Sequence, residues 1–443
     1  MTGPIPMRSK KLSSGRFARR FVAAAGAALV LAHLAACLPA SGPAPGPAAA
    51  TRAAPSGSGT ADPTASTAPE TRLPAPEDGV NHGPGLIALP DGRLLACWYS
   101  GSAEADADVR ILCSDSADGG DQWSPSVVAV GPGGQAAGAA SPNKSVGNAT
   151  LLLDGRGTLW LIYGVIRRWD WPVIGTLCRN WRCGRVDARP SPDLGRHWGP
   201  AVRLDDDTGA LPRGRPLHLP AIGDVLPLYH EGGEDSYLRI LDMAAVPAAG
   251  ASSAFPPPSR TVPVPGGGII EPAALPLADG RILLMFRDNR RIAVRMAIAD
   301  PARGAVSPAV PTDLANPGSP VELFADRQGR IVVVHNPGTG GRDALALAWT
   351  RDGVHVRPGC VLVPAGTEGD VAYPAIARTD DGIWHVVYSS DGKRRIRHRR
   401  FDDAWLDRCL ASGEAVPHDG VPVQTILDKR AGSLPLPNAQ FFN

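Results

Sequence analysis

The strongest constraint on the fold is a unit that recurs along the chain, in which two apolar runs flank a turn that contains Gly. The first copy turns at Asp91-Gly92, a dipeptide typical of tight β-hairpins. The six copies are Leu86–Tyr99, Leu151–Tyr163, Leu219–Tyr229, Ala273–Arg287, Val321–Asn336 and Ala375–Tyr388. Their spacing of about 50 to 70 residues leaves room for about four short strands per unit, the content of one propeller blade. We therefore predict an all-β fold, a six-bladed β-propeller.

A second motif, S-x-D-x-G-x-x-W, lies between the hairpins. Full copies occupy Ser116–Trp123 and Ser191–Trp198, and degenerate ones are expected at Thr350–Gly353 and Ser390–Gly392. The Asp accepts backbone N–H groups, the Gly takes a positive φ, and the Trp packs beneath the hairpin. This motif resembles the Asp-box of the sialidase-like propellers. It supports the fold rather than a particular chemistry.

The N-terminus has the features of an export signal with a lipid-attachment site. Basic residues precede the apolar run Phe21–Ala36, which is too short to span a bilayer comfortably. The run ends in Leu-Ala-Ala-Cys, which resembles the bacterial lipobox, so Cys37 is the expected site of lipidation. We predict a lipoprotein signal peptide at 1–36, a disordered tether rich in Ala, Pro and Ser at 37–76, and the propeller at 77–443. The expected location is the outer membrane, the periplasm or the cell surface of a bacterium.

The remaining cysteines suit an oxidising compartment, because six are left once Cys37 is set aside. One pairing, among 15 connectivities, joins Cys97 to Cys113 on two strand-like runs. It closes a small loop between Cys178 and Cys183, and leaves Cys360 with Cys409. Their spacing does not indicate a metal site, and we expect no cofactor or metal. The formal net charge of +2 gives no broad basic field, so nucleic acid is not an expected partner.

Residues 80 to 406 resemble the sialidase family blade by blade. The family places an Arg at the start of the first blade, where this chain has His82 in Asn81-His-Gly-Pro-Gly-Leu86. An acid/base Asp follows in a loop of the same blade. Glu104 lies closest to that position, and Asp106 and Asp108 remain alternatives.

The second half of the chain keeps more of the family pattern. Glu271 opens one hairpin strand and Arg287 ends its partner, and we expect both to point to the propeller mouth. Arg342 lies where the family has its third Arg, and Tyr373 lies at the place of the Tyr nucleophile. Further mouth positions without a family counterpart are Asn148, His230, Glu231, Asn316 and Ser319.

The resemblance implies a retaining exo-glycosidase. A neutral phenol avoids the repulsion that a carboxylate nucleophile would meet beside the carboxylate of a sialic acid. Tyr373 would attack with Glu271 as its base, Glu104 would serve as acid and base, and Arg287, Arg342 and His82 would bind the substrate. The expected partners are sialylated or other acidic glycans, and the membrane through the lipid anchor.

Two alternatives remain open, because the first family Arg is missing. One is a hydrolase or lyase for another acidic or rhamnose-bearing glycan. The other is a glycan-binding lipoprotein without catalytic activity. Protonation of His82 below a pKa of about 6.5 is expected to strengthen binding of an acidic sugar.

Overall fold

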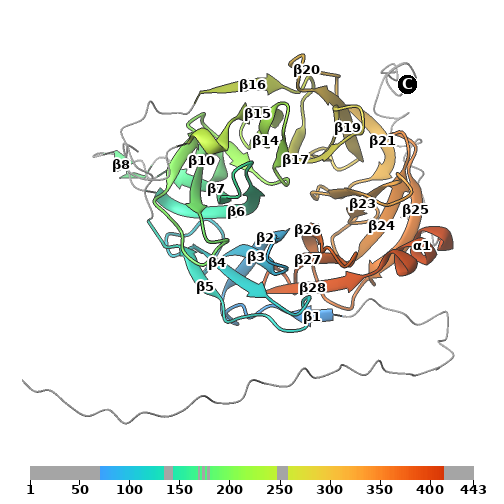
Figure 1. Cartoon of the computed structure of the whole chain (residues 1–443), viewed down its shortest axis with the longest axis horizontal. Helices are drawn as coiled ribbons and strands as arrows, with labels where there is room; N and C mark the ends of the chain where they lie inside the picture. The colour runs from blue at the N-terminus through green and yellow to red at the C-terminus, as the bar shows by residue number, and fades with distance from the viewer. Residues whose placement is uncertain are drawn as a thin grey trace, which may run out of the picture. The chain divides into compact units, whose positions relative to one another are not determined.

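Each repeated hairpin forms the two innermost strands of one sheet. A computed structural model describes residues 70–133, 143–167, 170–171, 175–176, 180–246 and 258–413. All of these belong to the second of the two units into which the chain divides, Pro63–Asn443. Within these ranges the strands form six sheets of four or five strands and one two-stranded sheet. The six larger sheets surround a central axis as propeller blades, as Figure 1 shows, so the predicted fold is confirmed.

The first three blades follow chain order from the innermost strand outward. Blade 1 contains β2 (Val80–Ala88), β3 (Leu94–Gly101), β4 (Arg110–Ser116) and β5 (Val127–Val130). Blade 2 contains β6 (Asn143–Leu153), β7 (Leu159–Arg167), β10 (Gly184–Ser191) and β11 (Val202–Asp205). Blade 3 contains β12 (Ala210–Pro212), β13 (Leu217–Leu219), β14 (Gly223–His230), β15 (Asp235–Leu241) and β16 (Ser259–Pro263). The small sheet pairs β8 (Asp170–Trp171) with β9 (Gly175–Thr176), and short 3-10 helices lie at Trp181–Cys183 and Met243–Ala245.

The other three blades complete the ring. Blade 4 contains β17 (Ile269–Pro276), β18 (Ile282–Asp288), β19 (Ala293–Asp300), β20 (Ala305–Val306) and β21 (Val310–Ala315). Blade 5 contains β22 (Glu322–Ala325), β23 (Ile331–His335), β24 (Leu345–Thr350) and β25 (Arg357–Val363). Blade 6 contains β26 (Ala372–Arg378), β27 (Trp384–Ser390), β28 (Arg395–Phe401) and, as its outermost strand, β1 (Glu70–Arg72). The helix α1 (Asp403–Ser412) follows β28 and packs against blade 5.

The ring is closed by β1, which joins the beginning of the described chain to the last blade. Glu70 pairs with Arg399 and Arg72 with Arg397 in an antiparallel register. Glu70 also accepts a 2.6 Å hydrogen bond from Nη2 of Arg399. The strand begins inside the range predicted to be a tether, so the boundary at residue 76 is wrong and the last residues of that range belong to the propeller.

Apolar cores fill the spaces between neighbouring blades. Successive residues of a strand face opposite sides of the sheet. In β3, Leu95, Cys97 and Tyr99 therefore pack toward blade 2, whereas Leu94 and Trp98 pack toward blade 6. The same alternation in each blade joins all six into a ring, and the clusters that span them hold most of the buried apolar residues.

Three of the four expected Asp-boxes form turns between the two outer strands of a blade. In the first, Gln122 N–H donates to Asp118 Oδ1 at 2.9 Å, and Gly120 N–H donates to Ser116 Oγ at 2.8 Å. Gly120 has φ +87°, and a Cβ there would lie 2.2 Å from the imidazole of His398. The prediction at Ser390–Gly392 is wrong, because this segment is the turn between β27 and β28.

The two disulfides with both cysteines described follow the predicted pairing. Cys97 is bonded to Cys113 and Cys360 to Cys409. Cys183 is also disulfide-bonded, whereas Cys178 lies outside the described residues. The predicted signal peptide and Cys37 lie outside them too. In the part of the chain that the structure describes, no helix has the length and apolar character needed to cross a membrane.

Candidate active site

A common backbone feature marks the inner strand in four blades. In each of these strands the pairing register shifts, and a residue at the shift has a positive φ. These residues are Gly83 (61°), Asn148 (49°), Glu271 (51°) and Tyr373 (60°). Such bulges re-aim a side chain, and positive φ is strained for residues other than Gly. The backbone thus directs Glu271 and Tyr373 out of the regular sheet pattern.

Tyr373 and Glu271 are in direct contact. The Tyr373 hydroxyl donates to Oε1 of Glu271 at 2.7 Å. Tyr373 is 9% exposed and Glu271 is 2% exposed, so the bond is shielded from water. Since β26 and β17 belong to blades 6 and 4, the propeller ring brings the two residues together.

Arg287, at the end of β18, completes the group. Its Nη1 donates to Oε2 of Glu271 at 2.9 Å and lies 3.4 Å from the Tyr373 hydroxyl oxygen. The adjacent carboxylate Asp288 binds Arg290 and not Arg287. Tyr373, Glu271 and Arg287 therefore form one hydrogen-bonded cluster.

The electrostatic environment separates the two acidic groups of this cluster. Burial and the charge of Glu271 raise the pKa of the Tyr373 phenol well above its usual range, against the opposing effect of Arg287. Burial alone would also raise the pKa of Glu271, but Arg287 and the Tyr373 hydroxyl outweigh it, and the pKa lies below 4.5. Glu271 is consequently a carboxylate that is able to receive a proton from the neutral phenol.

Two further guanidinium groups lie over the Tyr373 ring. The Cζ of Arg342 is 5.7 Å from the ring centroid and that of Arg213 is 5.0 Å from it. Arg342 donates to the carbonyl of Gly318. Sequence reasoning did not find Arg213, which lies between the short strands β12 and β13, where blade 3 has no continuous inner strand to match the repeat.

Arg213 supports the site from within the fold. It is buried and donates to the carbonyls of Pro84 (3.3 Å) and Pro374 (2.8 Å), which follow the bulge residues of blades 1 and 6. Buried Glu322 lies near it, and burial raises the pKa of Glu322 although Arg215 and Arg213 oppose this. Arg213 therefore ties together the backbone that carries Tyr373 and the backbone next to His82.

His82 packs against the nucleophile candidate and is not free to titrate near neutral pH. Its ring centroid lies 4.2 Å from that of Tyr373, and its Nδ1 lies 2.8 Å from Ser389 Oγ. Burial, followed by the charges of Lys393 and Arg342, lowers its pKa well below 6.5. This lowered pKa runs against the expectation that His82 gains a proton just below pH 6.5, because burial and then the surrounding cations oppose a charge on its ring.

Glu104 lies in the loop between β3 and β4, within reach of two other blades. Its Oε1 accepts from Trp181 Nε1 at 3.0 Å, and its Oε2 accepts from Lys393 Nζ at 2.7 Å. The alternatives Asp106 and Asp108 both accept hydrogen bonds from Ser102 and hold the loop itself. Among the three acidic residues, Glu104 is the one held by contacts from outside its loop.

Glu231, at the end of β14, is a second carboxyl at this mouth. Burial and the negative charges of Glu271 and Glu104 raise its pKa, with Arg287 opposing. Tyr229 and Asn148 also lie nearby, because Asn148 Nδ2 donates to the Tyr229 hydroxyl at 3.1 Å and the charges of Glu271 and Glu231 act on Tyr229. The site therefore holds two candidates for a proton donor.

The other mouth positions suggested by the sequence have local structural partners. His230 lies 2.9 Å from Asp235. Asn316 accepts from the backbone N–H groups of Gly318 and Ser319, and Ser319 Oγ donates to Asn336. These contacts account for the three residues without a ligand.

The fold and the cluster around Tyr373 define a sialidase-like β-propeller. A family model described as a BNR repeat-like domain matches residues 92–386, well over half of the chain, and the protein belongs to this family. None of the curated proteins matches the chain.

Solved structures of sialidases share the fold. A Hadza microbial sialidase is 17% identical with a TM-score of 0.56 over 74% of this chain and 67% of its own. The NanB sialidase from Streptococcus pneumoniae is 13% identical with a TM-score of 0.57 over 74% and 69%. The intramolecular trans-sialidase from Ruminococcus gnavus is 12% identical with a TM-score of 0.58 over 77% and 96%. At these identities the likeness concerns the fold alone.

Proposed function

We propose that the protein is a retaining exo-glycosidase that removes a terminal sialic acid or a related acidic sugar. The observation that carries this proposal is the buried 2.7 Å hydrogen bond from Tyr373 to Glu271, with Arg287 bound to the same carboxylate. A tyrosine whose proton can pass to an adjacent carboxylate is an activated nucleophile. The names of the structurally similar sialidases support the substrate class.

The first half of the reaction forms a bond between Tyr373 and the sugar. The phenolic oxygen attacks the anomeric carbon while its proton moves to Glu271, and the bond to the leaving-group oxygen breaks. A carboxylic acid protonates that oxygen. We assign this role to Glu104, and Glu231 is the competing candidate because its pKa is raised.

The second half returns the enzyme to its starting state. The carboxylate that gave up its proton now removes one from water, and the resulting oxygen attacks the anomeric carbon. Tyr373 leaves and regains its proton from Glu271. Two displacements at the same carbon retain the anomeric configuration.

Substrate binding falls to the cations that surround Tyr373. Arg287 and Arg342 are suited to grip a carboxylate, since guanidinium groups form short, charge-assisted bonds with it. His82 contributes a neutral ring face rather than a third cation, given its lowered pKa. The lack of a third cation at this position supports a second candidate, a hydrolase or lyase that acts on another acidic or rhamnose-bearing glycan.

The decisive experiment is product analysis by mass spectrometry. Purified protein is incubated with 3′-sialyllactose, 6′-sialyllactose and a set of glucuronides and rhamnosides, with the Tyr373→Phe variant as control. Release of free sialic acid by the parent protein, and not by the Tyr373→Phe variant, supports the proposal. Because one similar structure is a leech intramolecular trans-sialidase complexed with 2,7-anhydro-Neu5Ac, anhydro products are measured as well. Turnover of only non-sialylated substrates supports the second candidate, and binding without turnover indicates a glycan-binding lipoprotein.

A further inference from the structure

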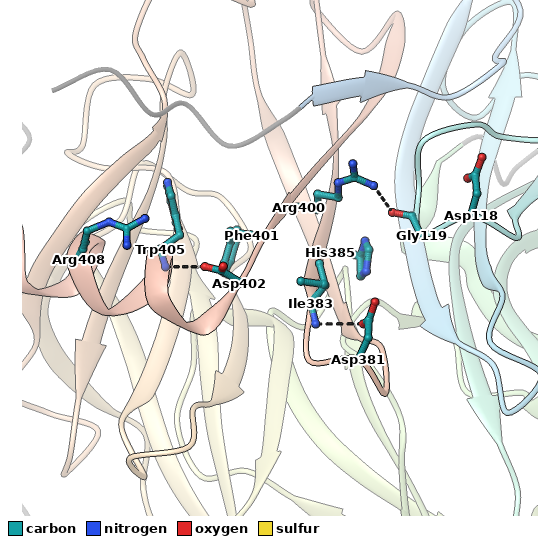
Figure 2. Close-up of a pocket in the computed structure, with 10 residues that line it drawn as sticks. All are labelled: Asp118, Gly119, Asp381, Ile383, His385, Arg400, Phe401, Asp402, Trp405 and Arg408. Atoms are coloured by element: carbon teal, nitrogen blue, oxygen red, sulfur yellow. Dashed lines mark hydrogen bonds between the residues drawn. The ribbon is translucent and has the colours of Figure 1, made fainter. Parts of the chain in front are cut away.

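A pocket lies at the other end of blade 6 from Tyr373. It has a volume of about 480 Å³. Its lining, shown in Figure 2, includes the carboxylates Asp118, Asp381 and Asp402, the guanidinium groups of Arg400 and Arg408, and the ring of Trp405. The lining comes from the Asp-box turn of blade 1, the β26–β27 turn with the start of β27, the end of β28, and α1 with the residue that precedes it.

The topology separates this pocket from the candidate active site. Tyr373 is near the start of β26, whereas Asp381 lies in the turn that follows its end at Arg378. A strand of this length spans roughly 20 Å. A ligand in the pocket would thus not contact the residues around Tyr373.

Three carboxylates of the pocket have one oxygen committed to the fold and one without a partner among the described residues. Oδ1 of Asp118 accepts from Gln122 N–H, Oδ1 of Asp381 from Ile383 N–H, and Oδ1 of Asp402 from Trp405 N–H. Within the described ranges, Oδ2 of each has no hydrogen-bond donor. Because turn and helix-cap bonds fix these side chains, their second oxygens are acceptors in defined places.

Donors and an aromatic surface complete the lining. Arg408, on α1, is exposed and forms no ion pair in the described part of the chain. Arg400 holds the pocket wall by donating to the Gly119 carbonyl at 2.9 Å and by an ion pair with Asp121 at 2.6 Å. Trp405 packs on Phe401 with ring centroids 4.8 Å apart, which fixes its orientation beside the carboxylates.

This combination favours an uncharged ligand rich in hydroxyl groups. The three carboxylates oppose an anion, and Arg408 opposes a cation, whereas Arg400 is already paired with Asp121. Among the described residues no group of three or more His, Cys, Asp or Glu side chains is placed to hold a metal ion. Sugar hydroxyls both donate to carboxylates and accept from guanidinium, and the C–H face of a pyranose packs on an aromatic ring. We propose that the pocket is a second glycan-binding site that takes a neutral pyranose. This inference does not depend on the activity proposed for Tyr373.

The test measures sugar binding by the full chain in the Tyr373→Phe background, so that turnover does not interfere. Saturation-transfer NMR and titration calorimetry use lactose, N-acetyllactosamine and methyl rhamnoside. Inorganic phosphate and Ca²⁺ serve as charged probes. We expect saturable binding of at least one sugar and none of the ions.

Isosteric variants then locate the binding. Asp381→Asn and Asp118→Asn keep the fold-bound oxygen and replace the other by an amide, and each should weaken binding about tenfold. Arg408→Ala should weaken it as well. The matched controls are Asp279→Asn, in the equivalent turn of blade 4, and Arg303→Ala, an exposed arginine of that blade, and neither should have an effect.

Three results would overturn the inference. These are the absence of saturable sugar binding, sugar binding that the three pocket variants leave unchanged, and binding of phosphate or Ca²⁺ that these variants abolish. In the parent background the pocket variants should leave release of sialic acid from 3′-sialyllactose unchanged. The absence of sugar binding in the pocket and the absence of the proposed catalysis are therefore measured separately.

Discussion

Tyr373 and Glu271 are separated by 102 residues in sequence, yet their side chains share a 2.7 Å hydrogen bond at the mouth of the propeller. The chain contains a similar group in blade 6. There the Tyr388 hydroxyl donates to Glu368 at 3.0 Å and accepts from Arg399 at 2.9 Å. Because Tyr388 lies on the regular strand β27 and Arg399 also binds Glu70 of β1, this second group serves ring closure. The bulge in β26 is the feature that sets Tyr373 apart.

Replacing Tyr373 by Phe should abolish turnover and leave the fold intact. Only the attacking oxygen is removed, so kcat should fall by roughly a thousandfold or more while substrate affinity changes little. Steady-state kinetics and calorimetric binding measure the two effects. Tyr388→Phe is the matched control, which should lower thermal stability but retain kcat. Near-normal turnover by a folded Tyr373→Phe protein would exclude the tyrosine as nucleophile.

The position of the acid limb of the pH–rate profile should depend on Arg287. Arg287 helps to hold the pKa of Glu271 below its usual range against the effect of burial, so Glu271 stays a carboxylate further into acid than it would without Arg287. In Arg287→Gln the effect of burial on the pKa of Glu271 is less opposed, so this pKa should rise. The acid limb of the profile should therefore move to higher pH. The measurement is kcat/KM from pH 3 to 8, and the test is the midpoint of the limb rather than the rate. An unshifted midpoint would show that Glu271 does not govern it.

Buried imidazoles should make the propeller less stable in acid. His385 Nδ1 lies 3.0 Å from His398 Nε2, and burial lowers the pKa to about 4 for His385 and about 3 for His398. The unfolded chain binds these protons near pH 6.5, so stability falls as the pH drops from 6.5 toward 4. In His385→Gln/His398→Gln the loss of unfolding free energy between pH 7 and pH 4.5 should be smaller by about 5 kcal/mol. Urea unfolding at the two pH values measures it, and an equal loss in both proteins contradicts the prediction.

The blades could be predicted because their signal is local. Each hairpin shows its apolar runs and its turn within about fifteen residues, and the Asp-box needs only eight. The exception is Ser390–Gly392, where the same residue types form the turn between β27 and β28. Composition also misplaced the boundary at residue 76. Pairing of Glu70–Arg72 with β28 depends on a strand more than three hundred residues away.

The site was predictable only through its resemblance to a family. Nothing near Tyr373 in sequence indicates Glu271, and ring closure is what brings them together. Arg213 escaped notice because it stands in a break between β12 and β13. His82 was recognised as a departure, but its burial among Lys393, Arg342 and Arg213 is a property of the assembled ring. Residues close together in sequence thus predict the propeller blades, whereas the protonation states at the candidate site depend on charges from distant segments.

Lipidation of Cys37 remains a proposal, since it lies outside the described residues. If Cys37 carries the anchor, Cys37→Ser should leave the protein unprocessed or soluble. Membrane fractionation and intact-mass measurement of the mature protein check this. A conservative change at the neighbouring Leu38 should preserve membrane partition. Unchanged partition of the Cys37→Ser protein would contradict the proposal.

The identity of the proton donor can be decided by varying the leaving group. A sugar alcohol leaves only when protonated, whereas an activated aryl alcohol such as 4-methylumbelliferone needs little help. If Glu104 is the acid, Glu104→Gln should slow cleavage of sialyllactose by about a hundredfold or more and slow bond cleavage in the aryl sialoside far less. Glu231→Gln, the matched change at the competing carboxyl, should affect both substrates to a similar, smaller extent.

The same variants also separate the two halves of the reaction. Without its general base the enzyme should accumulate the Tyr373-linked sugar, so Glu104→Gln should release the aryl alcohol in a burst followed by a slow phase. Azide attacks without losing a proton, and adding it should accelerate the slow phase and yield a glycosyl azide. If the burst and the azide rescue appear in Glu231→Gln instead, then Glu231, whose pKa burial and Glu271 raise, is the acid/base. The bonds of Glu104 to Trp181 and Lys393 would then serve only to hold the loop across the mouth.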